Sequence, residues 1–339
     1  MAEYWQRETH SDRRPLLIAR NRVKRALQDW FETRGFTAVE CGAIQRSPGN
    51  ETHLHAFATH WQPEGGAAEA RYLHTSPEFA SKKLLAAGET HIVDFARVWR
   101  NREAGPLHAP EFTMIEWYRA QADWTQVMDD AVALCRVALA ATQNDALRWQ
   151  GRSCVPGAEP EVLTLSEAFD RFAGIALPAL LGDRDGLAAA CRGIGITVAA
   201  DDVWSDLFSK VVVTRIEPQL GHGRLTLLTE YPIAEAALAR PCPADPRFAE
   251  RFEMYACGVE LANGFGELTD AAEQRRRFVA DMDEKARLYG ERYPIDEDLL
   301  AALTLMPPAS GVALGFERLA LLATGGRQIN DMIWTPFPV

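Results

Sequence analysis

The segment at residues 97–118, RVWRNREAGPLHAPEFTMIEWY, constrains the fold most, because it combines residues of β-strand type with dense charge. If its two ends pair as a hairpin, the alternation of the second arm puts Glu116 and Tyr118 on one face, while bulky residues occupy both faces. A strand covered on both sides cannot bury Glu116 alone, since an unpaired buried charge costs several kcal/mol. We therefore expect a cation beside Glu116, supplied either by Arg97 or Arg100 or by a ligand.

The composition is that of an ordinary globular protein, with 339 residues of which 47% are hydrophobic and 24% are charged. The first twenty residues are polar and charged and lack the apolar core of a signal peptide. No apolar run approaches the about 20 residues that a membrane helix requires. We therefore expect a cytoplasmic protein that does not contact a membrane.

Charge and cysteine content narrow the expected partners. The formal net charge of -11 argues against a broad nucleic-acid surface, because such surfaces depend on lysine and arginine. The basic segment RRPLLIARNRVKRAL, residues 13–27, could form a local patch, although an amphipathic helix with a solvated basic face is the simpler interpretation. The six scattered cysteines form no C-x-x-C pair and predict neither a zinc site nor a disulfide framework.

Helical periodicity predicts an opening helix from about Pro15 to Arg34, and a second helix that starts at Ser76-Pro77. Glu78 then falls in the first helical turn, where the helix dipole alone could explain a carboxylate. Further helices are expected at residues 124–142 and 270–289, strands at 36–44, 71–75 and 223–232, a hairpin at 252–268, and a mostly helical insertion at about 162–222.

The hairpin at residues 252–268 suggests a metal site. With Ala256 and Cys257 as a two-residue turn, Glu253 lies opposite Glu260. Like charges in this position repel, so either one carboxylate points to solvent or a divalent cation lies between them, and Mg²⁺ bound to carboxylates and substrate phosphates fits.

The usual nucleotide-binding signatures are absent from the sequence, which has neither a P-loop motif nor a complete dinucleotide fingerprint. A phosphate site must therefore be built differently. The remaining candidate is GVALGFERLALL, residues 311–322, where a glycine-containing strand runs into an apolar helix that starts near Glu317 and Arg318.

Four segments together resemble the class II aminoacyl-tRNA synthetases. FARVWRNREAGPLHAPEFTMIEWY (95–118) is similar to their second signature motif and GVALGFERL (311–319) to their third, while HTSPEF (74–79) and FEMYACGVELANGFGELTD (252–270) resemble the lysyl branch. Within that branch, the similarity is greatest to the compact paralogues that attach (R)-β-lysine or lysine to elongation factor P. The resemblance implies an α+β fold, with one class II catalytic domain over residues 1–339 whose antiparallel sheet is flanked by helices.

The resemblance also implies the chemistry. In this family the carboxylate of an amino acid attacks the α-phosphate of ATP and forms an aminoacyl adenylate without an enzyme nucleophile, so that catalysis is positioning and charge neutralisation. Arg100 would hold the α-phosphate and the substrate carboxylate, Phe112 would stack on adenine, and Arg318 would bind the γ-phosphate and adenine. Glu253 and Glu260 would hold Mg²⁺. The other implied ATP contacts are Asn101, Arg102, His108, Ala109, Met254 and Gly315.

A lysine-type substrate would explain the acidic side chains. The resemblance implies that Glu78 lies near one of its two ammonium groups and that Glu116 and Glu267 lie near the other. An acidic pocket favours a diamine over the aspartate or asparagine of other relatives. The other implied substrate contacts are Ser76, Pro77, Tyr118, Glu260 and Asn263.

Four residues depart from the family pattern. Gly42 replaces the usual proline of the first motif, which bears on the dimer interface, and Ala109 replaces an asparagine of the ATP site. Arg102 stands where many relatives have a glutamate that contacts adenine, with Glu103 one position later. Ala313 replaces the middle glycine of the third motif, a change typical of the ligase branch, and should narrow the pocket floor.

The acceptor of the activated amino acid could be a tRNA or a protein. The first core helix begins by about Pro15, so we expect no anticodon-binding OB-fold before it. With the acidic charge, this favours elongation factor P over tRNA, and the resemblance implies a homodimer. Two alternatives stay open: a minimal ligase that charges tRNA through its acceptor stem, and a catalytically silent amino-acid-binding regulator, which Arg102 and Ala109 would allow.

Overall fold

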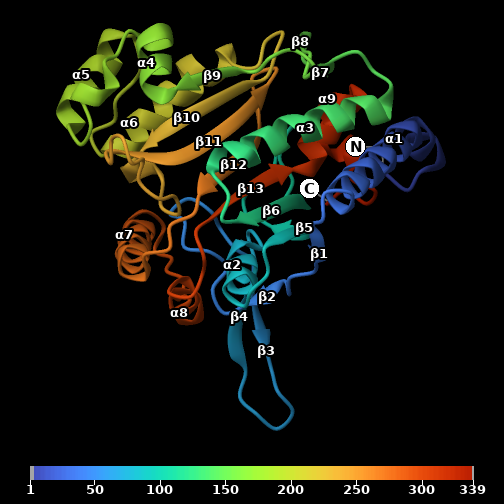
Figure 1. The fold of residues 1–339 in the computed structure, drawn as a ribbon, viewed down its shortest axis with the longest axis horizontal. Coiled ribbons are helices and arrows are strands. Elements are labelled where there is room, and N and C mark those ends of the chain that lie inside the picture. The colour runs from blue at the N-terminus through green and yellow to red at the C-terminus, as the bar shows by residue number, and fades with distance from the viewer. Residues whose placement is uncertain (1–3, 338–339) are drawn as a thin grey trace.

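A large mixed sheet organises the protein (Figure 1), which we describe from a computed structural model of residues 4–337. Its eight strands run in the order β1-β5-β6-β13-β12-β11-β10-β9. The central strands are antiparallel, whereas β1 and β9 pair in parallel at the two edges. The strands are β1 Thr37–Val39, β5 His91–Trp99, β6 Glu111–Ala120, β9 Glu161–Thr164, β10 Thr226–Pro232, β11 Phe248–Ala256, β12 Val259–Gly266 and β13 Ala309–Gly315.

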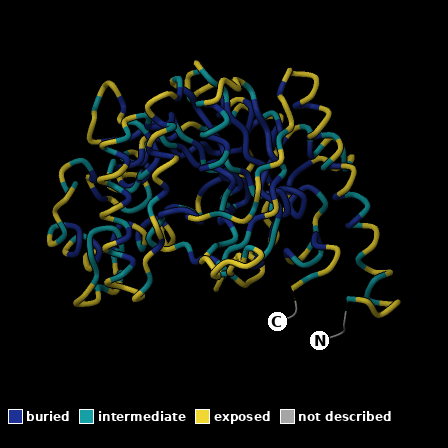
Figure 2. The backbone as a smooth tube through the Cα atoms, turned by 90° about the horizontal axis from the view of Figure 1, so that it is seen from below, coloured by how far each residue is buried: buried dark blue, intermediate teal, exposed yellow. Residues whose placement is uncertain are grey.

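Helices cover both faces of this sheet, which gives the α+β architecture expected from the sequence (Figures 1 and 2). One face packs against α1, α3 and α9 in the main hydrophobic core, and part of the other face packs against α2, α7 and α8. The buried backbone is concentrated in the sheet between them (Figure 2). These helices are α1 Arg7–Glu32, α2 Glu78–Ala86, α3 Trp124–Thr142, α7 Ala271–Tyr289, α8 Glu297–Leu303 and α9 Phe316–Thr324.

The opening helix differs from the prediction at its N-terminus. It begins at Arg7, and Pro15 lies inside it rather than at its first turn. Two of its arginines are also not solvated: Arg13 donates to backbone carbonyls near the C-terminus, and buried Arg20 pairs with Glu317 at 2.8 Å. The predicted basic face therefore serves partly to attach α1 to the last helix, because a desolvated guanidinium needs such partners.

The segment that the sequence marked as an insertion is mostly helical and has its own hydrophobic cluster (Figure 1). Phe208 stacks between Phe169 and Trp204, with ring centroids 5.3 Å apart in each pair. Its helices are α4 Leu165–Ala173, α5 Arg184–Gly193 and α6 Trp204–Val211, with short turns η1 Leu177–Ala179, η2 Val212–Ile216 and η3 Glu217–Gln219. Two other short turns, η4 Ile233–Glu235 and η5 Ile329–Met332, lie outside it.

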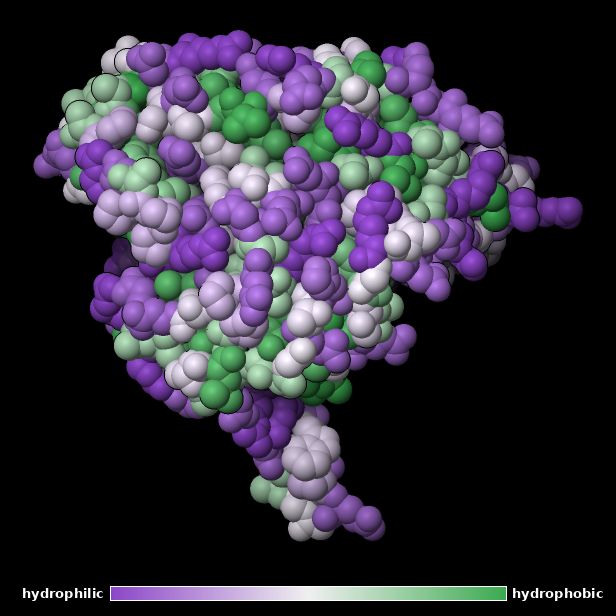
Figure 3. Space-filling model, viewed as in Figure 1, coloured by the Kyte–Doolittle hydropathy of each residue, from purple (hydrophilic) through white to green (hydrophobic). Residues whose placement is uncertain are grey.

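Two small sheets accompany the large one. Strands β7 Leu147–Trp149 and β8 Arg152–Cys154 form a hairpin, and β2 Ile44–Gln45, β4 Glu69–Leu73 and β3 Ala58–Trp61 form a sheet in that order. The β3–β4 hairpin projects from the body as an arm (Figures 1 and 3). Among the helices of the described residues, none is both long and apolar enough to cross a membrane.

The β11–β12 hairpin corrects the predicted register. Its two-residue turn is Cys257-Gly258, and Tyr255 lies opposite Glu260. A bulge beyond this pair then places Glu253 opposite Asn263. The predicted pairing of Glu253 with Glu260 was wrong, because Cys257 adopts the left-handed conformation (φ +57°) that moves the turn by one residue.

The turn before β10 offers a test of backbone packing. Gly221 and Gly223 both have left-handed backbones (φ +71° and +74°), but a Cβ on Gly221 would lie 2.5 Å from the Ala256 Cα, whereas Gly223 faces open space. Alanine at either position should lower the free energy of unfolding by about 1–2 kcal/mol, because a residue with a Cβ is strained in the left-handed conformation. Gly221→Ala should lose a further 1–3 kcal/mol, roughly, through overpacking. Chemical denaturation of both variants measures the difference, and equal losses would contradict this account.

Candidate active site

A cavity of about 490 Å³ lies over β6, β11, β12 and β13, on the sheet face that bears Glu116. Its volume is in the range of small-molecule sites, roughly 300–1,000 Å³. Two loops close it from above, one at residues 51–54 and the other at 234–238. The predicted site residues that line it are Ser76, Glu78, Arg100, His108, Ala109, Phe112, Glu253, Glu260, Asn263, Gly315 and Arg318.

The polar floor of the site is set by strand register. Cross-strand pairing aligns five residues in one row over β5, β6, β13, β12 and β11: Asp94, Glu116, Ala313, Asn263 and Glu253. Side chains that are directly opposite on one face of a sheet are close neighbours. The sheet therefore brings together residues as distant in the sequence as Asp94 and Ala313, and Ala313 lies at the centre of the row.

The bulge in β12 explains why Glu260 belongs to the site although its predicted register was wrong. A bulge adds one residue to a strand and can redirect a side chain. Here Glu260 and Leu261 both line the cavity although they are adjacent in the strand.

At one end of the cavity, Arg318 is held at three points. Its guanidinium donates to the Leu107 carbonyl (3.2 Å) and the Glu260 carbonyl (3.0 Å) and contacts His108 Nε2 (2.7 Å). Burial, followed by the charge of Arg318, lowers the pKa of His108, so that a neutral imidazole can accept this hydrogen bond. The arrangement provides a fixed positive charge that faces the cavity.

A second cation, Arg100, lies further along the same cavity. Its Nε donates to the Thr75 carbonyl at 3.3 Å, and its Nη1 lies 3.8 Å from a Glu103 oxygen. The guanidinium carbon is 5.4 Å from the ring centroid of Phe112. An aromatic face and two guanidinium groups in one cavity suit a purine nucleotide with its phosphates.

Arg102 points away from the cavity. It has a left-handed backbone (φ +69°), its side chain is 53% exposed, and it pairs with Glu291. Glu103 lines the cavity instead, next to Arg100. Arg102 thus stands where many relatives have a glutamate, and the turn at Arg102 directs the next residue, Glu103, into the cavity.

Glu116 is buried, and no cationic side chain of residues 4–337 pairs with it. It accepts hydrogen bonds from Ser76 Oγ (2.7 Å) and the Tyr118 hydroxyl (2.5 Å). The expected internal partners are engaged elsewhere, Arg97 with Glu111 at 2.7 Å and Arg100 with Glu103. Of the two predicted sources of a cation, the arginines are therefore ruled out, and a ligand stays a prediction.

Burial raises the pKa of Glu116 to about 8, and the negative charge of Glu78 adds to this effect. Ser76 also lines the cavity, so the Glu116 carboxylate lies directly behind the cavity wall. A ligand that brought a positive charge to this wall would relieve the cost of ionising Glu116.

A residue that the sequence analysis missed, Lys82, compensates the other two carboxylates. Its ammonium group is fully buried and lies 2.6 Å from Glu78 Oε1 and 2.7 Å from Glu267 Oε2. Burial acts to lower the pKa of Lys82, but Glu267 and Glu78 together raise it, so the lysine stays charged. The spacing of Glu78 and Lys82, four residues apart in one helix, was the signal in the sequence that could have revealed this pair.

One oxygen of Glu267 has no partner in the described part of the chain. Glu267 Oε1 is buried and accepts no hydrogen bond there. It lies with the Tyr118 ring against the Cα of Gly311, where a Cβ would come within 2.6 Å of the oxygen and 2.3 Å of the ring. Burial raises the pKa of Glu267 to about 7 although Lys82 opposes this shift. The pocket thus holds three buried carboxylates, and the Lys82 ammonium group contacts two of them, Glu78 and Glu267.

The comparison with known proteins agrees with this geometry. A family model described as tRNA synthetases class II (D, K and N) matches residues 3–339. The chain belongs to this family. An elongation factor P–(R)-β-lysine ligase of Erwinia tasmaniensis is 37% identical over 321 residues, which are 94% of this chain and 93% of that protein.

Two similar proteins carry the same description. The one from Haemophilus influenzae (strain ATCC 51907) is 38% identical over 330 residues, covering 94% of this chain and 95% of its own. The one from Proteus mirabilis is 36% identical over 327 residues, covering 95% and 94%. The class II synthetase fold predicted from the sequence motifs is confirmed, and the chain is an ATP-dependent amino acid ligase of this family.

The class II family makes Mg²⁺ an expected companion of ATP, and the residues fit it only in part. Burial and the charge of Glu253 raise the pKa of Glu260, which is the repulsion that a cation would relieve. Both oxygens of Glu253 are already used, by Arg251 (2.6 Å) and Tyr255 (2.5 Å). No set of three metal-ligand side chains occurs among residues 4–337. Mg²⁺ commonly relies on one or two carboxylates and on phosphates, so the pair suits a metal–nucleotide complex rather than a metal alone.

Several predicted site residues do not line the cavity. Met254 is fully buried in the main hydrophobic core on the opposite face of the sheet, and Pro77 is the buried N-cap of α2. Asn101 is exposed and donates through its backbone to His55. The cavity-lining residues that sequence reasoning missed include Glu51, Glu103, Glu235, Arg251, Leu261 and Asp281.

Replacement of Lys82 should measure the charge compensation in this pocket. Lys82→Met leaves Glu78 and Glu267 buried without a cation, which should lower the free energy of unfolding by about 3–5 kcal/mol. The loss should be smaller at pH 5 than at pH 8, because protonation removes the orphaned charges. The neighbouring Lys83, whose side chain is 32% exposed and pairs with Asp296, is the matched control, and Lys83→Met should cost about 1 kcal/mol or less. Equal losses for both variants would contradict the assigned role.

Glu116 should make stability depend on pH. Since its pKa is higher in the folded protein (about 8) than in the unfolded chain, the folded state holds the extra proton between these values, and stability falls as pH rises through that window. Glu116→Gln should flatten this fall by up to about 1.4 kcal/mol per pH unit. Urea titrations between pH 5 and pH 8 on the ligand-free protein measure it, and an unchanged slope would refute the raised pKa.

Proposed function

We propose that this protein activates a lysine-type amino acid, (R)-β-lysine in particular, as an adenylate and transfers it to a lysine of elongation factor P. The observation that carries the proposal is Glu116, a buried carboxylate that pairs with no cation of residues 4–337. It lies behind the wall of a cavity that also holds two fixed guanidinium groups. The relatives, which are described as elongation factor P–(R)-β-lysine ligases, support the same substrate and acceptor.

The acidic pocket accounts for amino acid selectivity. Lys82 offsets part of the charge of Glu78 and Glu267, and an ammonium group of the substrate would offset Glu116. Tyr118, whose pKa is raised by burial and by Glu116, keeps its proton and holds one Glu116 oxygen in place. A substrate that lacks the second amino group cannot offset the cost of ionising Glu116 and loses this charged contact, which is a basis for rejection.

The two arginines account for the activation step. Arg100 would bind the α-phosphate and the attacking carboxylate, which approach each other only if their negative charges are screened. Arg318 would bind the γ-phosphate and adenine, with Phe112 stacked on the base. Mg²⁺, held by Glu260 and Glu253 together with phosphate oxygens, would supply further charge neutralisation. The remaining contribution of the enzyme is to align the carboxylate with the phosphorus.

The Ala313 side chain should affect which isomer is used. It lies between Glu116 and Asn263 in the floor row, so its methyl group occupies space that a glycine would leave free. We propose that this methyl group makes the pocket shorter and thereby favours the β-amino acid. We also propose that the protein is a homodimer and does not use tRNA.

Incubation of the purified protein with ATP, labelled lysine isomers and either elongation factor P or total tRNA tests this function. We expect label on elongation factor P alone, most strongly with (R)-β-lysine. Label on tRNA alone would overturn the acceptor. Lysine-dependent exchange of pyrophosphate into ATP separates a ligase from a silent amino-acid-binding protein, which shows none with any isomer.

Glu116→Gln should raise the KM for the amino acid at least about tenfold in this pyrophosphate exchange, since a charged contact is lost.

A further inference from the structure

Transfer to a protein lysine poses a proton problem that rests on the function proposed above. The ε-amino group of lysine has a pKa of about 10.4, so at neutral pH nearly all of it is an ammonium ion without a free electron pair. A tRNA hydroxyl arrives uncharged, whereas this acceptor must first lose a proton. A base close to the reacting carbonyl would remove this obstacle.

Most carboxylates around the cavity are already engaged. Glu78 pairs with Lys82, Glu103 lies near Arg100, Glu253 binds Arg251, and Glu260 lies 3.4 Å from Arg318. Glu235 and Asp281 accept hydrogen bonds, from Ser205 and Thr52 respectively.

Glu51 differs from all of these. It lines the cavity, and within residues 4–337 its carboxylate accepts a hydrogen bond from its own backbone but none from another side chain.

Glu51 lies beside the residues that face the reacting centre. Its carboxylate is close to the Cα of Gly49, where a Cβ would come within 2.5 Å of Glu51 Oε2 and 3.0 Å of Thr75 Oγ1. Thr75 in turn accepts a hydrogen bond from Arg100 through its carbonyl. Glu51 and Arg100 therefore both line the cavity and both lie next to the buried Thr75, and Arg100 is the proposed ligand of the α-phosphate and the substrate carboxylate.

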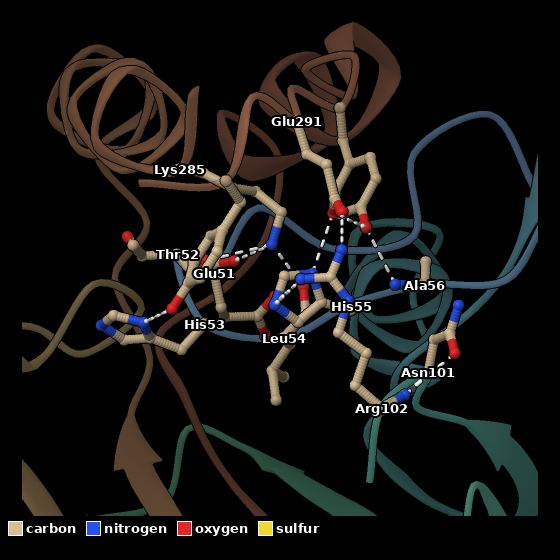
Figure 4. Close-up of polar contacts among 12 residues, drawn as sticks. Glu51, Thr52, His53, Leu54, His55, Ala56, Asn101, Arg102, Lys285 and Glu291 are labelled. Atoms are coloured by element: carbon tan, nitrogen blue, oxygen red, sulfur yellow. Dashed lines mark hydrogen bonds and ion pairs between the residues drawn. The ribbon is translucent and has the colours of Figure 1, made fainter. Parts of the chain in front are cut away.

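The loop that carries Glu51 is clamped to α7 and the chain after it (Figure 4). Lys285, from α7, is fully buried and donates to the carbonyls of Thr52 (3.0 Å) and Leu54 (2.6 Å), with a longer contact to that of Glu51 (3.5 Å). Further bonds fix the flanks: Thr52 to Asp281, Ala56 to the Tyr293 hydroxyl, and Asn101 to the His55 carbonyl. A catalytic group needs such support, because a site that is loose by about 1 Å loses much of its effect.

The charges around Glu51 suit a base. Its pKa is raised to about 7, first by burial and then by the negative charge of Glu78, while a hydrogen bond from its own backbone and the charge of Arg100 oppose this shift and Asp281 adds to it. The charge of Lys285 also interacts with Glu51. A carboxylate that is near half-ionised at neutral pH can accept a proton and release it again.

We propose that Glu51 is the general base for the transfer step. Its carboxylate takes one proton from the acceptor ammonium and becomes the neutral acid. The freed electron pair of the amine nitrogen forms a bond to the adenylate carbonyl carbon, and the bond from that carbon to the phosphate oxygen breaks, so that AMP leaves with its electrons. The second amine proton passes to solvent, and Glu51 then releases the proton that it took. The adenylation step needs no such base.

Glu51→Gln separates the two half-reactions. We expect its lysine-dependent pyrophosphate exchange to stay within about twofold of the wild type, while single-turnover transfer from preformed adenylate to elongation factor P falls at least about a hundredfold at pH 7. The rate should recover as pH rises, because the acceptor then ionises unaided. Transfer to hydroxylamine, which is already neutral at pH 7, should keep the wild-type rate.

The matched control is Glu64→Gln, the same change on the exposed loop of the β3–β4 arm, which should leave every rate unchanged. Wild-type transfer to elongation factor P by Glu51→Gln would overturn the inference, as would equal losses with hydroxylamine and with the protein. If the wild type itself transfers nothing to elongation factor P, the proposed acceptor fails and this inference with it. Loss confined to the variant and to the protein acceptor supports it.

Discussion

Buried negative charge is the constraint on which the rest of this structure depends. Desolvated carboxylates are costly, and the pocket behind Ser76 holds three of them with a single internal ammonium group. Lys82 lowers the free-energy cost of the folded state by neutralising part of this charge. The charge left on Glu116 is then available for a cationic ligand, so the same electrostatic imbalance that weakens the free protein provides selectivity for a diamine.

The antiparallel sheet converts this imbalance into a site of defined shape. Cross-strand register places Asp94, Glu116, Ala313, Asn263 and Glu253 in one row, while one bulge in β12 turns both Glu260 and Leu261 toward the cavity. Above this rigid floor lie loops that are attached by buried cations, as Lys285 attaches residues 51–54. Of the groups proposed for activation, Phe112 lies on β6, Arg100 directly follows β5 and Arg318 lies in α9, whereas a clamped loop holds the group proposed for transfer.

Much of the fold followed from local patterns. The helix at Trp124–Thr142 and the strand–helix junction at Gly315–Phe316 matched their predictions, because periodicity and glycines act over a few residues. The start of α1 did not, since Pro15 is tolerated within a helix whose buried face provides most of its stability. Eleven predicted site residues line the cavity, whereas Met254 lies on the opposite sheet face.

The sequence by itself determined the class II motifs, the order of the elements and the presence of unusual carboxylates in apolar strands. Only the tertiary structure decided how those carboxylates are compensated: Lys82 for Glu78 and Glu267, hydrogen bonds alone for Glu116, and no side-chain partner in the described chain for Glu51. The reason is physical. Alternation and helical spacing fix the face on which a side chain lies, but the energy of a buried charge depends on atoms within a few ångströms, and folding brings those atoms from distant parts of the chain.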